Sequence, residues 1–266
     1  MKEKSKKKPV LIVLAVIAAI IIGISIFVSV HAARNKKDMQ ATIDKGLVQV
    51  ESHYKVTPLD AGEYSNITMY GVMKFNTKQY DVEDLGNLSI MTTDMGMMQM
   101  VSFMITPYEK NVPLCTLDYM YILGNRKSYV EFYDLVNDPQ SEEYTAVLDA
   151  LREMQSRYDD ITELEATENW YDNYLTVVMH KSLSGKEEQR NQEMFCDALG
   201  TYLDVSAGLD KSSPEDAAAQ LAITEAYSNG LIEKGGVSTD VFKKALGEET
   251  TRDFFDKVFF GTDRAA

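Results

Sequence analysis

Hydrophobic and polar positions alternate with a period of two through the middle of the chain, most clearly in residues 112–136. There the odd positions from Leu117 to Leu123 are apolar, whereas the even positions include a carboxylate, Asp118. Side chains on a strand point alternately to its two faces, so this pattern is typical of strands with one buried face. A turn signal at Gly124-Asn125 divides the stretch into two arms. The sequence therefore predicts a β-hairpin with Asp118 in its first strand.

Further alternating segments and helical periodicities continue along the chain. The predicted strands are residues 64–76, 85–93, 97–106, 114–123, 127–136 and 170–179. The predicted helices that follow the main block of strands are residues 142–158, 189–205, 214–232 and 238–260. Short connections between consecutive strands imply antiparallel pairing. A block of strands with helices on either side predicts an α+β fold, in which helices cover both faces of an antiparallel sheet.

The N-terminal segment has a different pattern. Residues 1–9 are a basic tail with five lysines, and residues 10–30 form an uncharged apolar run of 21 residues, long enough to cross a bilayer as a helix. A cleaved signal peptide, with Val30-His31-Ala32 as its cleavage site, is the alternative, but its apolar core would be unusually long. The sequence predicts an uncleaved transmembrane helix. The lysines before it favour, by a small margin, a cytoplasmic N-terminus and an exported domain.

Two further parts follow the predicted anchor. Residues 31–62 are interpreted as a linker that contains a short helix at 38–53. Residues 63–266 contain all the predicted strands and the remaining helices, and their length suits a single domain.

Charge and composition exclude several classes of function. The net charge is −14, but residues 1–33 carry +4 and the remainder −18, which argues against nucleic acid as a partner. The two cysteines, Cys115 and Cys196, stand in apolar segments typical of buried thiols. The sequence has no phosphate-binding glycine loop, no nucleophile elbow, and no His or Cys pair at metal-ligand spacing. Nucleotide, flavin and zinc sites therefore have no support.

The hairpin resembles a stretch of the ferredoxin-dependent bilin reductases. Their pattern is a Pro-Leu pair, an Asp a few residues on, a turn with Gly, and a strand that ends in Asp-Leu. Here these are Pro113-Leu114, Asp118, Gly124 and Asp134-Leu135. A second match, FKKALGEETTRDFFDKVFF at residues 242–260, is similar to the closing helix of that family. The resemblance covers roughly residues 64–260. It implies an α/β/α sandwich without a prosthetic group, in which the bilin takes single electrons from ferredoxin and side chains supply protons.

Within this resemblance, Asp118 matches the aspartate that donates protons in the family. A two-residue turn would place Glu131 opposite Asp118, and a four-residue turn would place Tyr133 there; both registers put the two residues on its face. Burial and a neighbouring acid raise the pKa of a carboxyl, so that it keeps its proton near neutral pH. The candidate catalytic residues are therefore Asp118 and Glu131. The alternative is a structural carboxylate that caps a backbone group or faces solvent.

The candidate substrate-binding residues are Ser102, Met120, Tyr133, His180 and Lys181. Ser102 takes the place of a histidine found in one branch of the family. Lys181, with His180 beside it, is the candidate cation for the propionates of a bilin. Methionines crowd residues 91–104, where they either fill gaps in the core or form a soft wall for a large flat ligand.

The expected activity is reduction of a bilin such as biliverdin, with ferredoxin as the electron donor and no bound cofactor or metal. An acidic domain would repel an acidic ferredoxin. The local basic cluster that would offset this consists of Lys243, Lys244, Arg252 and Lys257. One alternative is a membrane-anchored domain that binds a tetrapyrrole without reducing it. Another is an anchored interaction domain whose pocket is filled by its own side chains.

Overall fold

The computed structural model describes residues 7–165 and 168–264, so the predicted basic tail lies outside the described residues as far as residue 6. The described residues form an eight-stranded sheet in which every pairing is antiparallel. Its strands are β1 (Val56–Leu59), β2 (Asn66–Met69), β3 (Met73–Val82), β4 (Gly86–Asp94), β5 (Met98–Pro107), β6 (Leu114–Ile122), β7 (Asn125–Tyr133) and β8 (Leu175–Ser184). The order is β1-β3-β4-β5-β6-β7-β8, with β2 also paired to β3.

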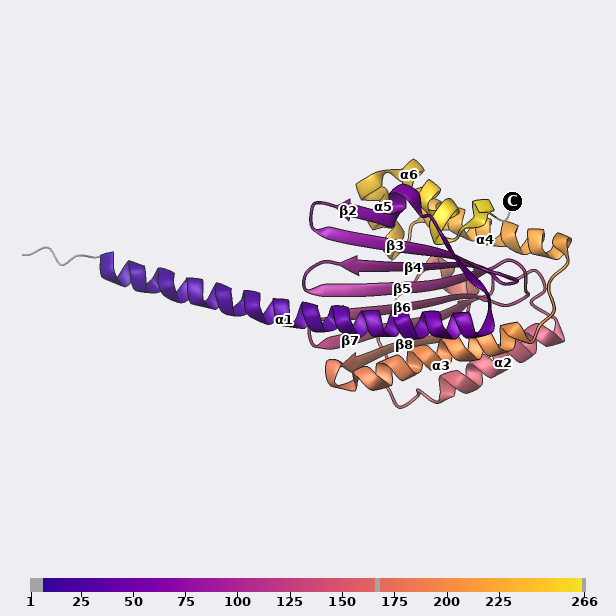
Figure 1. The fold of residues 1–266 in the computed structure, drawn as a ribbon, viewed down its shortest axis with the longest axis horizontal. Coiled ribbons are helices and arrows are strands. Elements are labelled where there is room, and N and C mark those ends of the chain that lie inside the picture. Colours follow the sequence, from indigo (N-terminus) through magenta and orange to yellow (C-terminus); the bar gives the residue numbers. More distant parts are fainter. Residues whose placement is uncertain (1–6, 166–167, 265–266) are drawn as a thin grey trace, which may run out of the picture.

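Helices cover both faces of this sheet (Figure 1). The helices on one face are α1 (Lys7–His53), α2 (Glu142–Ser156) and α3 (Glu188–Ala207). Those on the other are α4 (Pro214–Lys234), α5 (Val237–Leu246) and α6 (Glu248–Phe254), followed by a π-helical turn, Phe255–Phe259. The buried apolar side chains form two clusters, one with α1–α3 and one with α4–α6. The α+β fold with its sheet between two helical layers is therefore as predicted.

Glycines and left-handed turns explain where the predicted elements were too long. The predicted strand 64–76 is interrupted by a turn at Tyr70 and Gly71, whose φ angles are 51° and 71°, and this turn joins β2 to β3. Similarly, the predicted helix 238–260 is broken at Gly247, where φ is 86°. Such φ values suit glycine and end a regular element at that residue.

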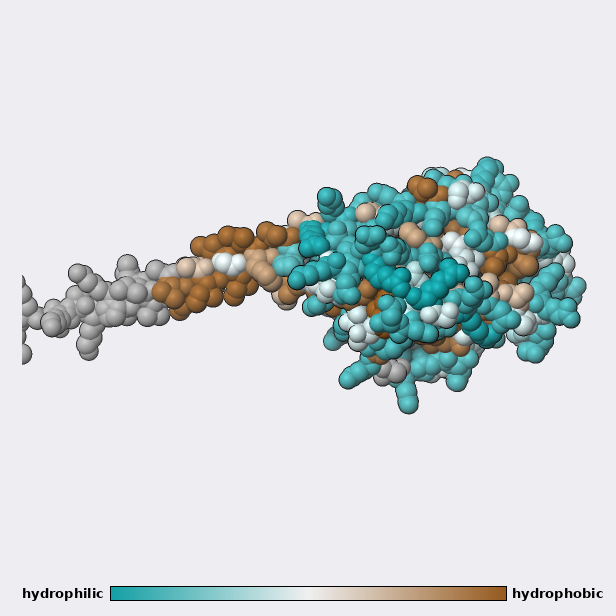
Figure 2. Space-filling view, turned by 90° about the horizontal axis from the view of Figure 1, so that it is seen from below, coloured by the Kyte–Doolittle hydropathy of each residue, from teal (hydrophilic) through white to brown (hydrophobic). Residues whose placement is uncertain are grey.

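Helix α1 is the element that differs most from the sequence interpretation. It runs unbroken from Lys7 to His53, so there is no linker between the apolar run and the predicted short helix. Its first part projects away from the sheet with apolar side chains exposed, and its second part packs against the sheet (Figures 1 and 2). The helix is long and apolar enough to cross a membrane, with a mean hydropathy of 2.5 over its most apolar window.

A buried polar network fixes the second part of α1 to the sheet. Arg126 of β7 is 1% exposed, and its Nη2 lies 2.8 Å from Oδ2 of Asp38 in α1. The same guanidinium pairs with Glu188 of α3, and its Nη1 donates to Oδ1 of Asn35 at 3.1 Å. Because a buried charge is costly unless it is fully paired, these contacts hold α1, α3 and β7 in one arrangement.

Candidate active site

The two faces of β6 are buried to different extents. Cys115, Leu117, Tyr119 and Tyr121 at the odd positions are 0% exposed against α1–α3. The even positions on the opposite face, from Thr116 to Ile122, are only partly buried. The helices α4–α6 therefore cover this face incompletely. We call it the Asp118 face.

The neighbouring strand β5 extends the Asp118 face with apolar side chains. Ser102 lies directly opposite Asp118. In the same way Met100 lies opposite Met120, and Met98 lies opposite Ile122. Ser102 and Met120 were both predicted to lie at the site, and the structure brings both onto the Asp118 face. The half-buried methionines beside them line this part of the sheet.

The hairpin register differs from both predicted registers. The two-residue turn is Leu123-Gly124 rather than Gly124-Asn125, because Ile122 pairs with Asn125. Leu123 adopts a φ of 51°, a left-handed conformation that a leucine rarely takes. As a result Tyr129 lies opposite Asp118, and Glu131 lies opposite Thr116. The shift is two residues, so Glu131 and Tyr133 keep the predicted face.

Asp118 is a buried carboxyl with a raised pKa. Burial of its carboxyl among apolar neighbours raises its pKa to about 7; a hydrogen bond with Ser102 opposes this rise, and the charge of Glu131 adds to it. Within the part of the chain that the structure describes, its Oδ1 has no hydrogen-bond partner. A carboxyl with such a pKa is partly protonated at neutral pH, and its free oxygen faces no competing protein group.

Glu131 is the centre of a hydrogen-bonded group beside Asp118. The hydroxyl of Tyr133 donates to its Oε2 at 2.5 Å, and Nε2 of His180 lies 2.6 Å from its Oε1. The His180 ring meets the ring of Tyr129 edge-on, with centroids 5.0 Å apart. Three side chains from β7 and one from β8 thus form one connected group.

Two tyrosines approach this group from outside the sheet. Tyr171 lies in a 3-10 turn, Trp170–Tyr174, and its pKa is raised to about 12 by burial and by the charges of Glu131, Asp172 and Asp118. Tyr227 of α4 stacks obliquely on Tyr133, with ring centroids 5.5 Å apart. Sequence reasoning missed Tyr129, Tyr171 and Tyr227. The alternation along β7 would have revealed Tyr129, whereas the other two come from distant segments that no local pattern connects to Asp118.

Lys181 lies away from this site. It follows His180 on β8, so its side chain points to the opposite face, where it is 2% exposed and pairs with Glu163. The prediction that Lys181 lies at the site was wrong, because neighbouring residues on a strand point to opposite faces; His180 lies at the site, as predicted. Lys127 is the cation on the correct face, because it lies opposite Met120 and is exposed.

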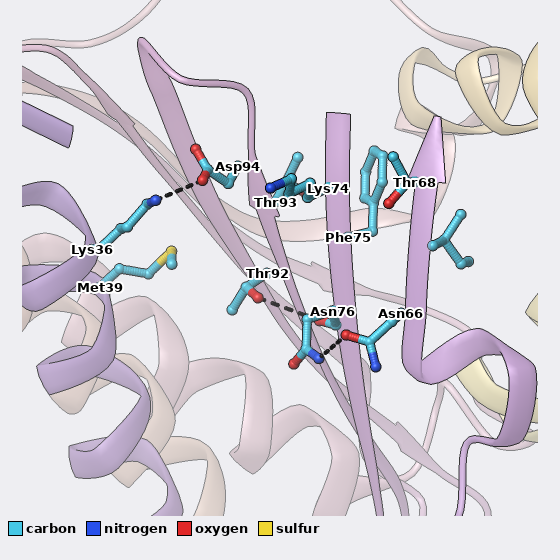
Figure 3. A pocket seen from close by; sticks show the side chains of 11 residues that line it. Lys36, Met39, Asn66, Thr68, Lys74, Phe75, Asn76, Thr92, Thr93 and Asp94 are labelled. Carbon is cyan, nitrogen blue, oxygen red and sulfur yellow. Dashed lines mark hydrogen bonds and ion pairs between the residues drawn. The ribbon is translucent and has the colours of Figure 1, made fainter. Parts of the chain in front are cut away.

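A cavity of about 330 Å³ lies apart from the Asp118 face (Figure 3). It lies between α1 and strands β2–β4, where Lys36 reaches from α1 to Asp94 at 2.6 Å. Thr92 belongs to its lining and pairs with Val101, whose partner Tyr119 is on the buried side of β6, so the cavity is not on the Asp118 face. Among the residues that the structure describes, no three His, Cys, Asp or Glu side chains cluster as a metal site requires.

Comparisons with known proteins show the fold. No family model and no curated protein matches the chain. A solved structure does. The crystal structure of phytochromobilin synthase from tomato in complex with biliverdin superposes with a TM-score of 0.70, covering 85% of this chain and 84% of that chain, at 13% identity. The fold expected from the bilin-reductase resemblance is confirmed. At this identity the roles of individual residues do not follow from the match.

Proposed function

We propose that this protein is a membrane-anchored bilin reductase. A linear tetrapyrrole such as biliverdin would lie against the Asp118 face and accept electrons singly from a low-potential donor, with one proton following each electron. Two electrons and two protons then convert one double bond of the bilin into a single bond. The single observation that carries the proposal is Asp118, a carboxyl with a pKa of about 7 on a sheet face that the helices cover only in part; its buried Oδ1 has no hydrogen-bond partner among the described residues. The similarity to a biliverdin-bound protein supports the choice of ligand.

The surrounding residues have distinct roles in this proposal. Asp118 is the proton donor, and Glu131 favours its protonated form through charge. Ser102 and the methionines, including Met120, form the polar contact and the apolar wall against which a flat ligand packs. Tyr133 orients Glu131, while His180 and Lys127 are the groups available to bilin propionates.

Ferredoxin is the proposed donor, although the predicted basic cluster gives it limited support. Lys257 pairs with Asp253 at 2.6 Å, and Arg252 pairs with Glu248 at 3.5 Å. Lys243 donates to the carbonyl of Ile232. The acidic partners of Lys257 and Arg252 neutralise two of the four charges in the cluster, so another low-potential one-electron donor would serve the same chemistry.

In the proposed topology, residues 10–30 of α1 cross the membrane with the N-terminus in the cytoplasm. The reductase domain then starts before the predicted boundary at residue 63, because the second part of α1 packs on the sheet and β1 (Val56–Leu59) pairs with β3. This topology follows from the distribution of lysines around the apolar run.

A tetrapyrrole carrier is the second candidate function. The net charge of −18 on the part of the chain after residue 33 favours it, because an acidic surface slows the approach of an acidic ferredoxin. Such a carrier would use the same sheet face and would not need Asp118 to release a proton.

The deciding experiment uses the full chain in detergent or nanodiscs under anaerobic conditions. Biliverdin titrated into the protein should give a saturable change in visible absorbance at micromolar concentrations. Ferredoxin and its reductase are then added, and the biliverdin absorption should decay to a product with shorter conjugation. Binding without reduction by any low-potential donor would establish the carrier. No saturable change would exclude both functions and leave the interaction domain.

A further inference from the structure

Exposed apolar side chains outside α1 gather at one end of the sheet. Among the described residues there, the large hydrophobic side chains that are strongly exposed are Tyr70, Val72 and Met97, at 58%, 69% and 58%. Single exposed apolar residues are common on soluble proteins, so their number alone means little. Their common location is informative, because all three lie in turns between consecutive strands: Tyr70 and Val72 between β2 and β3, and Met97 between β4 and β5.

These turns share one end of the domain with the projecting part of α1. The turns β2–β3, β4–β5 and β6–β7 all lie on the side from which α1 leaves the sheet (Figure 1). We call residues 70–72, 95–97 and 123–124 the hairpin tips. A Cβ added at Gly124 would lie 3.6 Å from Cε1 of His31, and Lys36 pairs with Asp94 at the end of β4. The β4–β5 and β6–β7 tips therefore lie beside the first two helical turns of α1 that follow Val30, where the apolar run ends.

The length of the apolar run sets the depth of the tips. The 21 residues of the run span roughly 31 Å as a helix, which matches the thickness of a bilayer hydrocarbon core. If the run fills the core, His31 is at the boundary between lipid tails and headgroups. The β6–β7 tip beside His31 is then at interface depth.

Charge distinguishes the two ends of the sheet. The hairpin tips contain no Asp, Glu, Lys or Arg. The connections at the opposite end are charged, with Glu83-Asp84 between β3 and β4 and Glu109-Lys110 between β5 and β6. The first exposed charged residues after the β2–β3 and β6–β7 tips are Lys74 and Lys127, which suit anionic headgroups.

We propose that the hairpin tips insert into the interface of the bilayer that α1 enters, so that the domain rests on the membrane at three points besides its anchor. The partner is a lipid surface, and the proposal depends on the membrane-spanning assignment of α1 but not on bilin reduction. Aromatic and apolar side chains at this depth exchange water for the acyl boundary. The half-buried Met98, Met100, Met120 and Ile122 then form an apolar path from the membrane surface to Asp118.

Depth-dependent fluorescence quenching tests the proposal in the full chain. Cys115 is buried, so a Cys196→Ser background leaves one added cysteine to carry an environment-sensitive dye. The labelled variants are Val72→Cys, Met97→Cys, Gln140→Cys and Ile20→Cys in vesicles of phosphatidylcholine with spin-labelled lipid. Gln140 is exposed beyond the far end of β7 and is the control for the domain. Ile20 in the apolar run is the control for the anchor.

Dyes at 72 and 97 should be quenched by spin labels near the headgroups at least threefold more than the dye at 140, and the dye at 20 by labels deep in the acyl chains. Equal quenching at 72, 97 and 140, with position 20 deep, would overturn tip insertion while the anchor stands. A dye at 20 that lipid labels do not quench would overturn the anchor and the proposal with it. Biliverdin binding, measured by absorbance, tests the proposed function separately.

A second variant guards against a dye that inserts by itself. The dye is attached at Asn125→Cys, next to the β6–β7 tip. The same protein also carries Val72→Asp and Met97→Asp, which place a charge in each of the other two tips. Charges in the other two tips should lower quenching at 125 at least twofold. Lys78→Asp, exposed in the middle of β3, is the matched control and should leave it unchanged. Unchanged quenching in the double variant would contradict insertion of those tips.

Discussion

The nine-residue strand β6 of the central hairpin has two faces that differ in burial and in chemistry. On one face β6 presents fully buried aliphatic and aromatic side chains to α1–α3. On the other it presents Asp118 and Met120, which the helices cover only in part. The first face follows the rule that cores contain apolar, closely packed side chains. The second departs from it by holding a carboxyl among apolar neighbours, and such departures are typical of functional sites. The difference teaches that one strand can stabilise the fold with one set of alternate residues and present a candidate site with the other.

The largest expected effect comes from removing the acid on the open face. Asp118→Asn keeps the size of the side chain but cannot donate a proton at neutral pH. Bilin reduction should fall by about 10²–10⁴-fold, the usual contribution of a positioned general acid, while biliverdin binding persists. Anaerobic turnover and absorbance titration measure the two quantities. Asp159→Asn, on an exposed loop, is the control, and equal turnover in both variants would make Asp118 a structural residue.

Truncations on the two faces should have opposite consequences. Leu117→Ala removes a fully buried side chain and should lower the free energy of unfolding by about 2–5 kcal/mol. Met120→Ala removes a half-buried one and should cost about 1 kcal/mol. Biliverdin affinity should reverse this order, falling several-fold for Met120→Ala and remaining unchanged in the folded fraction of Leu117→Ala. Urea titrations and absorbance titrations give both values, and the comparison fails if the two variants lose stability equally.

The pH dependence of stability should also separate the faces. The Asp118 pKa rises from 3.8 in the unfolded chain to about 7 in the folded protein. Between these values the unfolded chain has released the proton and the folded protein retains it, so this carboxyl lowers the free energy of unfolding as pH rises. The loss reaches about 4 kcal/mol at most above pH 7.

Asp118→Asn lacks this dependence, so its stability relative to wild type should increase from pH 4.5 to pH 8. Urea titrations at the two pH values measure the difference, and groups common to both proteins cancel. A constant difference would mean that the folded and unfolded pKa values of Asp118 are the same.

The smallest expected effect concerns the cation at the edge of the open face. Lys127→Gln should weaken biliverdin binding by about fivefold, because a solvent-exposed ion pair contributes up to about 1 kcal/mol. Lys78→Gln, exposed on the opposite face through its position in β3, should have no effect. Raising the salt concentration should reduce the difference between wild type and Lys127→Gln. If Lys78→Gln weakens binding equally, Lys127 has no specific role.

The parts of the molecule that sequence reasoning predicted are those with local causes. Apolar and polar positions alternate clearly in residues 112–136, so the two strands there and the face of Asp118 followed from a period of two. The register did not, because Leu123 occupies a left-handed turn position that sequence rules assign to Gly or Asn. Tyr171 and Tyr227 reach the site through tertiary packing, which has no signature in a single sequence.

The continuity of α1 was missed for a different reason. The charged residues after Val30 were interpreted as a linker, but a helix accepts charged residues as readily as apolar ones if it contains no proline. The decisive contacts lie elsewhere in the chain, in Arg126 and Glu188, which bury Asp38 and keep this part of α1 helical.

That unbroken helix has a consequence for how the protein meets other molecules. A flexible tether would let the domain sample many distances from a membrane and many orientations. A continuous helix that Arg126 fixes to the sheet restricts both. If α1 spans a membrane as proposed, the domain is a rigid attachment that moves only by lateral diffusion and by rotation about the membrane normal. A membrane-bound redox partner whose donor group lies at the same height would search in two dimensions instead of three. A soluble partner would have to approach in a narrow range of directions.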